Sequence, residues 1–572
     1  MSQAKRAHPG MRRVSSAAIA WTRKGLRANL PLAVVLAAAL AMPDYLMWAV
    51  TGEQRAVHTL DTTLYLLLFG LCVSLAAPRS LIAGFLIVLG AAEAVHFSFM
   101  AYFGGVIDAN LVLQGLVEHE DVLQGAVGVL RYIAYAPFVV ALPYAAAWLL
   151  IRRLLPGRAL IPYLWVLLFV AGATVPCKIV HAGNAVRYYP VDTLPSVANS
   201  YLTWSTFLFN HLPKSLIGSG TGGMDAYASV SVTRIAQPER ATAVIVMNES
   251  LTYDHMSLFG YGRDTTPRLI SLASDPHFLY REGISAGVGT LSTFYSFWNA
   301  VRDPRNERAF MEQHTNLFRL AKEAGFRTVV LSAQRANLLR GAGTQYVDEL
   351  HTLESEEALY ERLHDEMFEE LLGSIALGER NLIAIHLRSA HGPYAQNYAL
   401  RPELAIFPTD GLDYRNFQNN SYDDAVRYND FIMDRLVAYF RSNVEGPLYV
   451  FLTSDHGQLL GEGETPRYGH GMLLPQVAHV PIMLYEQHGA PEIAATLRQT
   501  HDPTHYELAR LIIRVLGYEI RDPNARHGVF YIAGTGFHGL SGYIRVRKPG
   551  DASGTTEFTE VPAGDAVIAG RD

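Results

Sequence analysis

The sequence predicts an α-helical membrane region followed by a large α/β domain with a largely parallel central sheet. Half of the 572 residues are hydrophobic, and long apolar stretches are concentrated in the first third of the chain. After about residue 185 the composition becomes that of an ordinary globular domain. There, short β-rich runs alternate with helical patterns, which is typical of parallel α/β sheets.

The membrane region is predicted from five apolar stretches, each long enough to cross a hydrocarbon core, which takes about 20 helical residues. They span residues 30–50, 59–77, 80–103, 127–151 and 161–180. A cleaved signal peptide is the alternative for the first stretch. The basic leader at 1–29 is long and more spans follow, which favours an uncleaved span. We therefore predict about five transmembrane helices within 30–183.

The distribution of basic residues predicts the orientation in the membrane. The leader is rich in arginine and lysine, and Arg152, Arg153 and Arg158 lie between the fourth and fifth spans. The loop between the third and fourth spans instead contains Glu118 and Glu120. By the positive-inside rule, the N-terminus is cytoplasmic and everything after about residue 183 is outside. In a bacterium with two membranes, this arrangement is that of a multi-pass inner-membrane protein with its large domain in the periplasm.

The polar part of the chain divides into three segments. Residues 184–237 contain prolines and a glycine run without strong periodicity, which indicates a linker that lies along the membrane region. Residues 238–548 hold the alternating strand and helix patterns and form the predicted folded domain. Residues 549–572 are polar and rich in small residues, and we expect a loose C-terminal tail.

Composition excludes several kinds of site. The two cysteines, Cys72 and Cys177, lie inside apolar runs, so the polar part has neither a disulfide framework nor a thiolate zinc motif. Any metal there must be held by His, Asp, Glu or a hydroxyl group. The net charge of −6 gives no reason to expect nucleic acid as a partner.

Candidate metal ligands follow two of the predicted strands. The strand-like runs are 243–247, 328–331, 382–386 and 448–453, with helical patterns at 315–324, 355–372 and 422–441. Glu249 follows the first run, and Asp455 and His456 follow the fourth. Ligands of parallel sheets collect at these carboxyl ends, and zinc accepts carboxylate oxygen and imidazole nitrogen. The alternative is that Asp455 caps a helix and His456 lines a turn.

A candidate nucleophile lies in the glycine-rich segment 285–293, which offers several hydroxyl groups before a helix-like stretch. A hydroxyl at a helix N-terminus that is bound to a cation ionises more easily and becomes a nucleophile. The alternative is a simple Ser/Thr helix cap, which is the commoner use of such residues. Local sequence alone favours the cap.

Several motifs together resemble those of the phosphoethanolamine transferases, which belong to the alkaline-phosphatase/sulfatase superfamily. Gly-Tyr-Gly-Arg-Asp-Thr-Thr-Pro at 260–267 resembles the end of the family's opening motif, which begins at Glu249. His-Gly-Pro at 391–393, Ser-Asp-His-Gly at 454–457 and Tyr-Gly-His-Gly at 468–471 resemble its later motifs. The resemblance covers nearly the whole chain, since five spans before an exported domain are also the family's plan.

The resemblance implies a zinc site and a nucleophile. Its zinc ligands correspond to Glu249, Thr290, Asp455 and His456, and Thr290 takes the position of the family's nucleophilic threonine. Thr293, three residues later, is the alternative nucleophile and a candidate substrate-binding residue.

The resemblance also assigns two further histidines. It implies that His391 and His470 lie beside the donor phosphate, where they bind a second zinc ion or transfer protons. We assign His386 to the core. The chain departs from the family after the nucleophile segment, where Phe294 replaces a common proline, and it lacks the cysteines that bracket this segment in several lipid A-modifying members.

The activity implied by the resemblance is transfer of phosphoethanolamine from phosphatidylethanolamine to lipopolysaccharide (lipid A or core) or another envelope glycan, through a zinc-activated threonine and a covalent phospho-threonine intermediate. A phosphoglycerol transferase of the same superfamily, or a membrane-anchored sulfatase or phosphodiesterase, is the alternative enzyme. The absence of cysteine after residue 177 excludes a sulfatase whose formylglycine derives from cysteine. A binding protein with a degraded site is disfavoured because every expected ligand position is filled.

Overall fold

The computed structural model describes residues 9–561 except 53–58, 118, 155–160, 162, 183–189, 191–193, 214–226, 239, 464–465, 537–540 and 550–553. The chain forms two compact units. The first comprises Met1–Leu113 and Val129–Gly218, and the second comprises Gln114–Gly128 and Ser219–Asp572. The last residues of the predicted tail, 562–572, lie outside the described part.

The first unit is helical, as predicted. Its long helices are α1 (Pro9–Thr51), α2 (Leu60–Ala76), α3 (Arg79–Phe103), α7 (Ala136–Leu154) and α8 (Leu164–Ala182). Four stretches of the described chain are long and apolar enough to cross a membrane: Asn29–Thr51, Ser80–Phe103, Leu130–Arg153 and Leu164–His181. The remaining predicted span, 59–77, is a shorter apolar helix of 17 residues.

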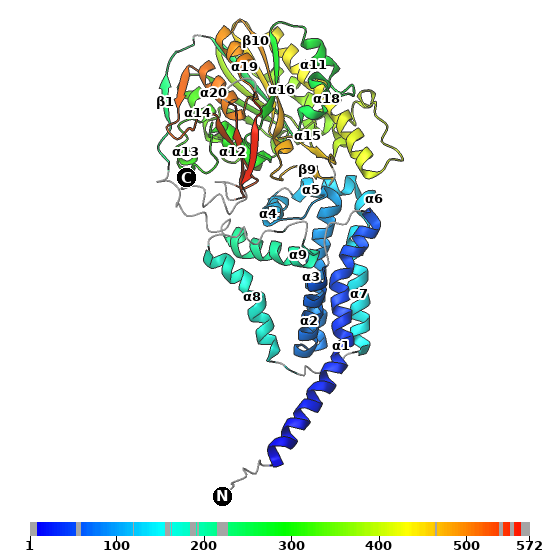
Figure 1. Ribbon diagram of the computed structural model, residues 1–572. Coiled ribbons are helices and arrows are strands. Elements are labelled where there is room, and N and C mark those ends of the chain that lie inside the picture. The colour runs from blue at the N-terminus through cyan, green and yellow to red at the C-terminus, as the bar shows by residue number, and fades with distance from the viewer. Residues whose placement is uncertain are drawn as a thin grey trace. The chain divides into compact units, whose positions relative to one another are not determined.

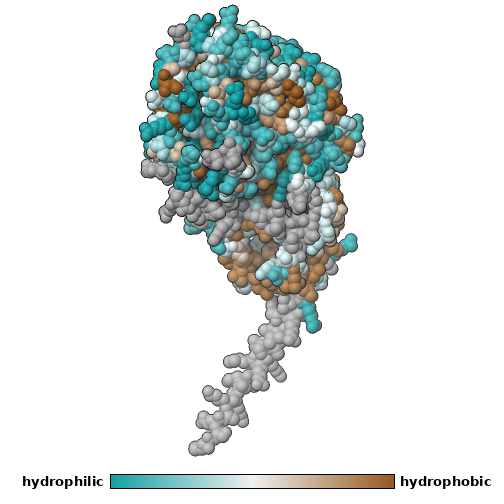
Figure 2. All heavy atoms as spheres, turned by 45° about the horizontal axis from the view of Figure 1, so that its top comes forward, coloured by the Kyte–Doolittle hydropathy of each residue, from teal (hydrophilic) through white to brown (hydrophobic). Residues whose placement is uncertain are grey.

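The surface of this unit is apolar, as a lipid-facing surface would be. Leu64, Leu68, Ile87 and Phe169 are among many large apolar side chains that are exposed there, and brown hydrophobic residues gather over this unit in Figure 2. Inside the unit, α1 packs against α2 and α7. A side chain at Gly70 of α2 would lie 2.7 Å from the carbonyl oxygen of Ala33, so glycine permits the close helix crossing that is common in membranes.

The segment expected to be a linker, 184–237, is partly structured. Residues Ser196–Thr206 form α9, which packs against α3 in the first unit and continues into the π-helical turn Phe207–His211. Ser231–Arg234 form β1, which pairs with β11 (Tyr518–Arg521) in the second unit. The glycine run at 218–223 lies outside the described residues.

The second unit is built on a seven-stranded sheet, labelled in Figure 1, in the order β3-β10-β7-β2-β6-β4-β5. Its strands are β2 (Ala241–Asn248), β3 (Phe278–Ile284), β4 (Arg327–Ser332), β5 (Glu349–His351), β6 (Arg380–His386), β7 (Leu448–Ser454) and β10 (His479–Gln487). The four runs predicted as strands are β2, β4, β6 and β7, and these are parallel. Because β10 is antiparallel to both β3 and β7, the sheet as a whole is mixed.

Both faces of the sheet are covered, which explains the unbroken apolar runs in the central strands. In β2, Ile245 packs into the core on one face and Val246 into the core on the other. The first core contains residues from α12 (Thr290–Trp298), α14 (Leu317–Glu323) and α20 (His505–Val515). The second contains residues from α16 (Met367–Ser374) and α18 (Tyr414–Asn443).

The helix predicted at 355–372 is interrupted. It consists of α15 (Leu353–Leu363) and α16, with His364 between them at a φ of 48°. The remaining α-helices of the described chain are α4 (Ala109–Val117), α5 (His119–Gly128), α6 (Leu130–Ile133), α11 (Pro267–Leu272), α13 (Glu307–Glu312), α17 (Tyr394–Asn397) and α19 (Pro491–Gln499).

A second sheet corrects the prediction for the C-terminal tail. Glu557–Val561 form β14, which pairs with β13 (Tyr543–Arg547), and β13 pairs with β12 (Val529–Ala533). The expectation of a loose tail is therefore wrong for these residues. No position of this short polar strand is fully buried and its exposed positions do not alternate regularly, so its sequence lacks the pattern that predicts a strand.

Candidate active site

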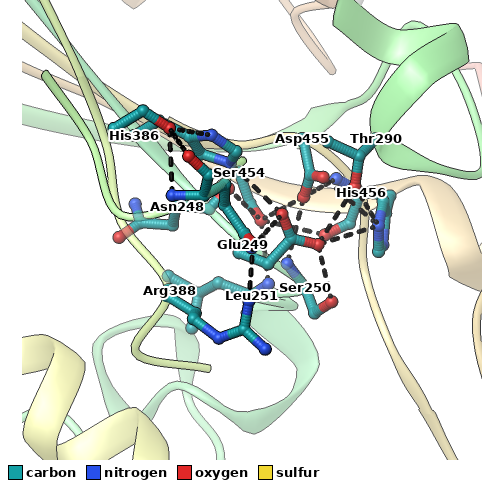
Figure 3. A network of polar contacts seen from close by, with 12 residues as sticks. Asn248, Glu249, Ser250, Leu251, Thr290, His386, Arg388, Ser454, Asp455 and His456 are labelled. Carbon is teal, nitrogen blue, oxygen red and sulfur yellow. Dashed lines mark hydrogen bonds and ion pairs between the residues drawn. The ribbon is translucent and has the colours of Figure 1, made fainter. Parts of the chain in front are cut away.

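The site lies at the carboxyl ends of two neighbouring strands. β2 and β7 are parallel, and Asn248 at the end of β2 pairs with Ser454 at the end of β7. Glu249 and Asp455 directly follow these residues and therefore emerge side by side, as Figure 3 shows. Both carboxylates are completely buried, although an isolated charge in such a place is strongly unfavourable. Their neighbours must therefore supply compensating groups.

The two oxygens of Glu249 have different partners. The Thr290 hydroxyl donates to Oε1 over 3.1 Å, and Nε2 of His456 lies 3.4 Å from the same oxygen. On the other side, Nε2 of His386 and Nε2 of Gln334 each lie 3.2 Å from Oε2. One oxygen thus faces the predicted nucleophile, and the other faces two nitrogen donors.

Asp455 is satisfied at one oxygen only. Its Oδ1 accepts hydrogen bonds from the backbone N–H groups of Ser250 (3.0 Å) and His456 (2.7 Å). Ser250 adopts a left-handed conformation, with a φ of 58°, that lets its N–H face this carboxylate. Among the described residues no hydrogen-bond donor serves Oδ2, which lies 3.3 Å from Nε2 of His456.

Thr290 begins α12, so its hydroxyl is at a helix N-terminus as predicted. The tight turn before it needs glycine at 287, since a side chain there would lie 2.6 Å from the Ser292 hydroxyl. Besides Glu249, the Thr290 hydroxyl lies 3.4 Å from Nε2 of His456. The Thr293 hydroxyl is buried and makes no hydrogen bond within the described chain. The geometry therefore brings Thr290, and not Thr293, to the two carboxylates.

The predicted histidines lie close to the cluster. The ring of His470 lies 4.0 Å from the ring of His456, because β8 (Leu459–Leu460) and β9 (Tyr468–Gly469) form a hairpin that returns the chain to the strand end. His391 follows β6 and is near enough for its charge to act on Glu249 and His470.

The assignment of His386 to the core is wrong. Its ring is 3% exposed, as a core residue's would be, but Nε2 is directed at the Glu249 carboxylate. His386 is the last residue of β6 and pairs with Met247 of β2, so it emerges beside Glu249. Two more residues that the sequence did not reveal, Gln334 and Arg388, follow β4 and β6 by two positions each. The rule that functional side chains follow parallel strands would have found them.

The electrostatics favour an ionised carboxylate at Glu249 and a neutral imidazole at His470. Burial acts to raise the pKa of Glu249, but hydrogen bonds from His386 and His456 hold it well below its ordinary value. Burial, followed by the charge of Glu249, raises the pKa of Asp455 to about 6. Burial and the charge of His456 hold the pKa of His470 well below its ordinary value, so that imidazole is neutral at pH 7.

These residues fit a divalent cation. Ligand atoms of Glu249, His386 and Asp455 lie within 4.8 Å of one another, and His456 adjoins them. Two adjacent buried carboxylates, one with an oxygen that no donor serves in the described chain, are the arrangement that a bound cation would stabilise. The oxygen and nitrogen donors suit zinc among the common divalent metals.

Comparisons with known proteins agree with this geometry. The family model described as "Sulfatase" matches residues 241–518. The Kdo(2)-lipid A phosphoethanolamine 7''-transferase of Escherichia coli strain K12 is 26% identical over 84% of this chain and 90% of its own length. The protein of that name from Salmonella typhimurium strain LT2 is 24% identical over 76% of this chain and 82% of its own.

A solved structure supports the same fold. The integral membrane protein lipooligosaccharide phosphoethanolamine transferase A (EptA) from Neisseria meningitidis superposes with a TM-score of 0.53 at 18% sequence identity. The match covers 85% of this chain and 94% of that one, so it includes both the apolar helices and the sheet domain. Residues 241–518 thus match the sulfatase family model, and most of the chain is similar in sequence to phosphoethanolamine transferases.

Proposed function

We propose that this protein is a zinc-dependent transferase that moves phosphoethanolamine from phosphatidylethanolamine to lipopolysaccharide, at lipid A or core, or to another envelope glycan. The observation that carries the proposal is the Thr290 hydroxyl, buried at a helix N-terminus 3.1 Å from Glu249 and beside Asp455 and His456. A hydrolase would need no more than an activated water. The threonine supports transfer through a covalent intermediate, and the relatives named above are transferases.

Glu249, Thr290, Asp455 and His456 would hold the zinc ion. Zinc, when bound, lowers the pKa of a coordinated hydroxyl and stabilises negative charge on a phosphoryl group. Thr290 is oriented for attack by its position at the start of α12 and by its contacts with Glu249 and His456. The surrounding burial excludes bulk water from the nucleophile.

The reaction proceeds in two displacements. In the first, the Thr290 hydroxyl gives its proton to Glu249, to which it already donates over 3.1 Å, its oxygen bonds to the donor phosphorus, and the bond between phosphorus and the diacylglycerol oxygen breaks. In the second, an acceptor oxygen bonds to the phosphorus, the bond to Thr290 breaks, and the Thr290 oxygen recovers its proton from Glu249. We assign protonation of the leaving oxygen in the first step, and removal of the acceptor's proton in the second, to His391. Burial and the charge of His456 hold the pKa of His470 well below its ordinary value, so His470 is uncharged at pH 7 and is the less suitable general acid.

The apolar helices agree with a lipid donor, since diacylglycerol and its phosphorylated form lie in the bilayer. The arginine and lysine pattern supports a cytoplasmic N-terminus and a periplasmic second unit in a bacterial inner membrane. An acceptor in the outer envelope is then made or transported past the same face of the membrane.

Mass spectrometry of the intact protein and its peptides tests the proposal. The full-length, zinc-loaded protein is incubated with phosphatidylethanolamine and no acceptor, and Glu249→Ala protein is the control. We expect a phosphoethanolamine adduct on Thr290 that is absent from the variant. An adduct on Thr293 would move the nucleophile, and a phosphoglycerol adduct from phosphatidylglycerol would favour the other transferase. No adduct with either lipid would contradict transfer through a threonine.

A further inference from the structure

Gln334 and Arg388 form a buried chain of hydrogen bonds that ends on Glu249. Nη1 of Arg388 donates to Oε1 of Gln334 over 2.7 Å, and Nε2 of Gln334 donates to Oε2 of Glu249 over 3.2 Å. Gln334 is 1% exposed and Arg388 is 8% exposed. Figure 3 shows the Arg388 side chain beside Glu249 and apart from Thr290. The two residues thus approach the carboxylate from the side away from the nucleophile.

Arg388 determines which way the Gln334 amide faces. A guanidinium group has N–H donors and no acceptor, so it stabilises only the orientation in which the amide oxygen points toward it. The amide NH₂ then necessarily points at Glu249. In the reversed orientation the amide oxygen would face a carboxylate oxygen at about 3 Å, and both contacts would become repulsive.

The backbone holds both residues in place. The N–H of Arg388 donates to Asp365 Oδ2 over 2.8 Å, and the N–H of Gln334 donates to the Ser332 hydroxyl over 3.1 Å. Both residues follow strands of the central sheet, β4 and β6, so their positions relative to Glu249 are set by the sheet. A rigid support of this kind preorganises a carboxylate.

As a consequence, the two carboxylate oxygens of Glu249 have different partners. Oε2 accepts from Gln334 and His386, while Oε1 faces the Thr290 hydroxyl and His456. If the carboxylate rotated, Oε2 would leave both donors. The support therefore keeps Oε1 available for the cation and the nucleophile.

We propose that Arg388 is a positioning residue that acts through Gln334, fixing the Glu249 carboxylate so that it presents a single oxygen to the zinc ion and Thr290. The inference deepens the proposed function and rests on its assignment of zinc to Glu249. Arg388 does not need to touch the donor lipid for this role. Its effect should therefore appear in metal affinity and turnover, and not in donor recognition.

The experiment measures zinc affinity of the full-length protein by chelator competition, together with kcat and KM for phosphatidylethanolamine. The variants are Arg388→Met, Gln334→Met, the double variant and Arg388→Lys. Methionine keeps most of the side-chain volume, and circular dichroism verifies folding. Arg302→Met is the matched control, because Arg302 donates to the backbone oxygens of Val529 and Arg526 and forms no hydrogen bond with a site residue in the described part of the chain.

We expect each methionine variant to bind zinc about tenfold more weakly and to lose about tenfold in kcat, with KM unchanged. The double variant should lose no more zinc affinity or kcat than either single variant, because each single change already breaks the same chain of hydrogen bonds to Glu249. Lysine at 388 should restore part of the affinity, since it keeps a donor for the Gln334 oxygen. Arg302→Met should leave zinc affinity unchanged.

Three results would overturn the inference: unchanged zinc affinity in folded Arg388→Met protein, additive losses in the double variant, or a rise in KM with affinity intact. The last would assign Arg388 to the donor lipid. If Arg388→Met does not fold, Gln334→Met alone decides between the same outcomes. Failure of the wild-type protein to bind zinc would contradict the proposed function instead, so the two failures are distinguishable.

Discussion

The second unit contains two buried aspartates beside histidines, and they are stabilised in opposite ways. Asp423 accepts from Nδ1 of His255 over 2.7 Å at one oxygen, and from Arg263 (2.6 Å) and the Tyr261 hydroxyl (3.0 Å) at the other. Asp455 has two backbone donors on Oδ1, and no donor within the described chain serves Oδ2. Both carboxylates are 0% exposed.

The difference separates a structural carboxylate, Asp423, from a candidate metal ligand, Asp455. At Asp423, protein groups, including a permanently charged arginine, occupy both oxygens, so the aspartate joins the 260–267 motif to α18 and leaves no place for a cation. At Asp455, the described chain supplies no hydrogen-bond donor to Oδ2, and the nearby His456 ring is shared with a second carboxylate, that of Glu249. Burial alone therefore does not identify a functional acid, whereas incomplete compensation does.

The largest expected effect is on catalysis at the cluster of Glu249, Thr290 and Asp455. Thr290→Ala should reduce transfer at least about 10³-fold, because removal of a nucleophile eliminates the covalent step, while thermal stability changes little. Transfer is measured with labelled phosphatidylethanolamine in detergent. Thr293→Ala, the matched control three residues away, should keep most of the activity. Equal losses in both variants would contradict the assignment of Thr290.

The cluster around Asp423, with His255 and Arg263, should contribute more to stability than the cluster around Asp455. Asp423→Asn should lower the free energy of unfolding by about 4 kcal/mol, because it leaves Arg263 and His255 without their carboxylate partner. Denaturant unfolding of the full-length protein measures this. Asp264→Asn removes a carboxylate whose side chain is 61% exposed, and it should change stability by less than about 1 kcal/mol. Similar effects of the two variants would remove the contrast.

The same cluster should make stability depend on pH. Burial acts to lower the pKa of His255, but hydrogen bonds to Asp423 and Glu462 outweigh it and raise the pKa to about 9. Because the folded pKa exceeds the unfolded value, the stabilisation is fully present below about pH 6.5 and is lost as pH rises through about 9. The loss is on the order of 3 kcal/mol. Unfolding between pH 6 and 9.5 should show it, and His255→Gln protein should lack this component.

The smallest expected effect is on the stability of Asp455→Asn protein, and it tests directly whether Asp455 differs from Asp423. In metal-free protein, Asp455→Asn should raise stability by about 1 kcal/mol, since it removes one of two buried carboxylates that share the single His456 ring and keeps an acceptor for the two N–H groups. In the presence of zinc, the same variant should lose the stabilisation that the wild type gains. Thermal unfolding with and without EDTA tests both halves. A destabilised metal-free variant would show that Asp455 is structural, like Asp423.

The sequence predicts the parts of this design that depend on local pattern. The apolar runs at 243–247 and 448–453 correspond to β2 and β7, which fixed the positions of Glu249 and Asp455 at neighbouring strand ends. Thr290 was predicted from the resemblance, because hydroxyls in a glycine-rich turn are otherwise typical of caps. Its contact with Glu249 is a property of the folded sheet.

What the sequence did not predict depends on which face or direction a buried strand takes. His386 ends a run that is apolar on both faces, so periodicity could not separate a site residue from a core residue. The antiparallel direction of β10 has no signature in an apolar run either. The positions of Gln334 and Arg388 after two strands follow a general rule, but their hydrogen bond joins residues 54 positions apart and could not be predicted from local sequence.

The second unit is discontinuous in the chain, which affects how the protein is synthesised and dissected. Residues Gln114–Gly128 are translated between two membrane helices, yet they belong to the unit whose sheet begins more than a hundred residues later. A side chain at Gly128 would lie 3.0 Å from the ring of Pro393, two residues from His391. A fragment beginning at Ser219 would keep the whole sheet and lose this neighbour. A soluble fragment should therefore bind metal with the affinity of the full-length protein, whereas transfer rates should be measured on the full-length protein.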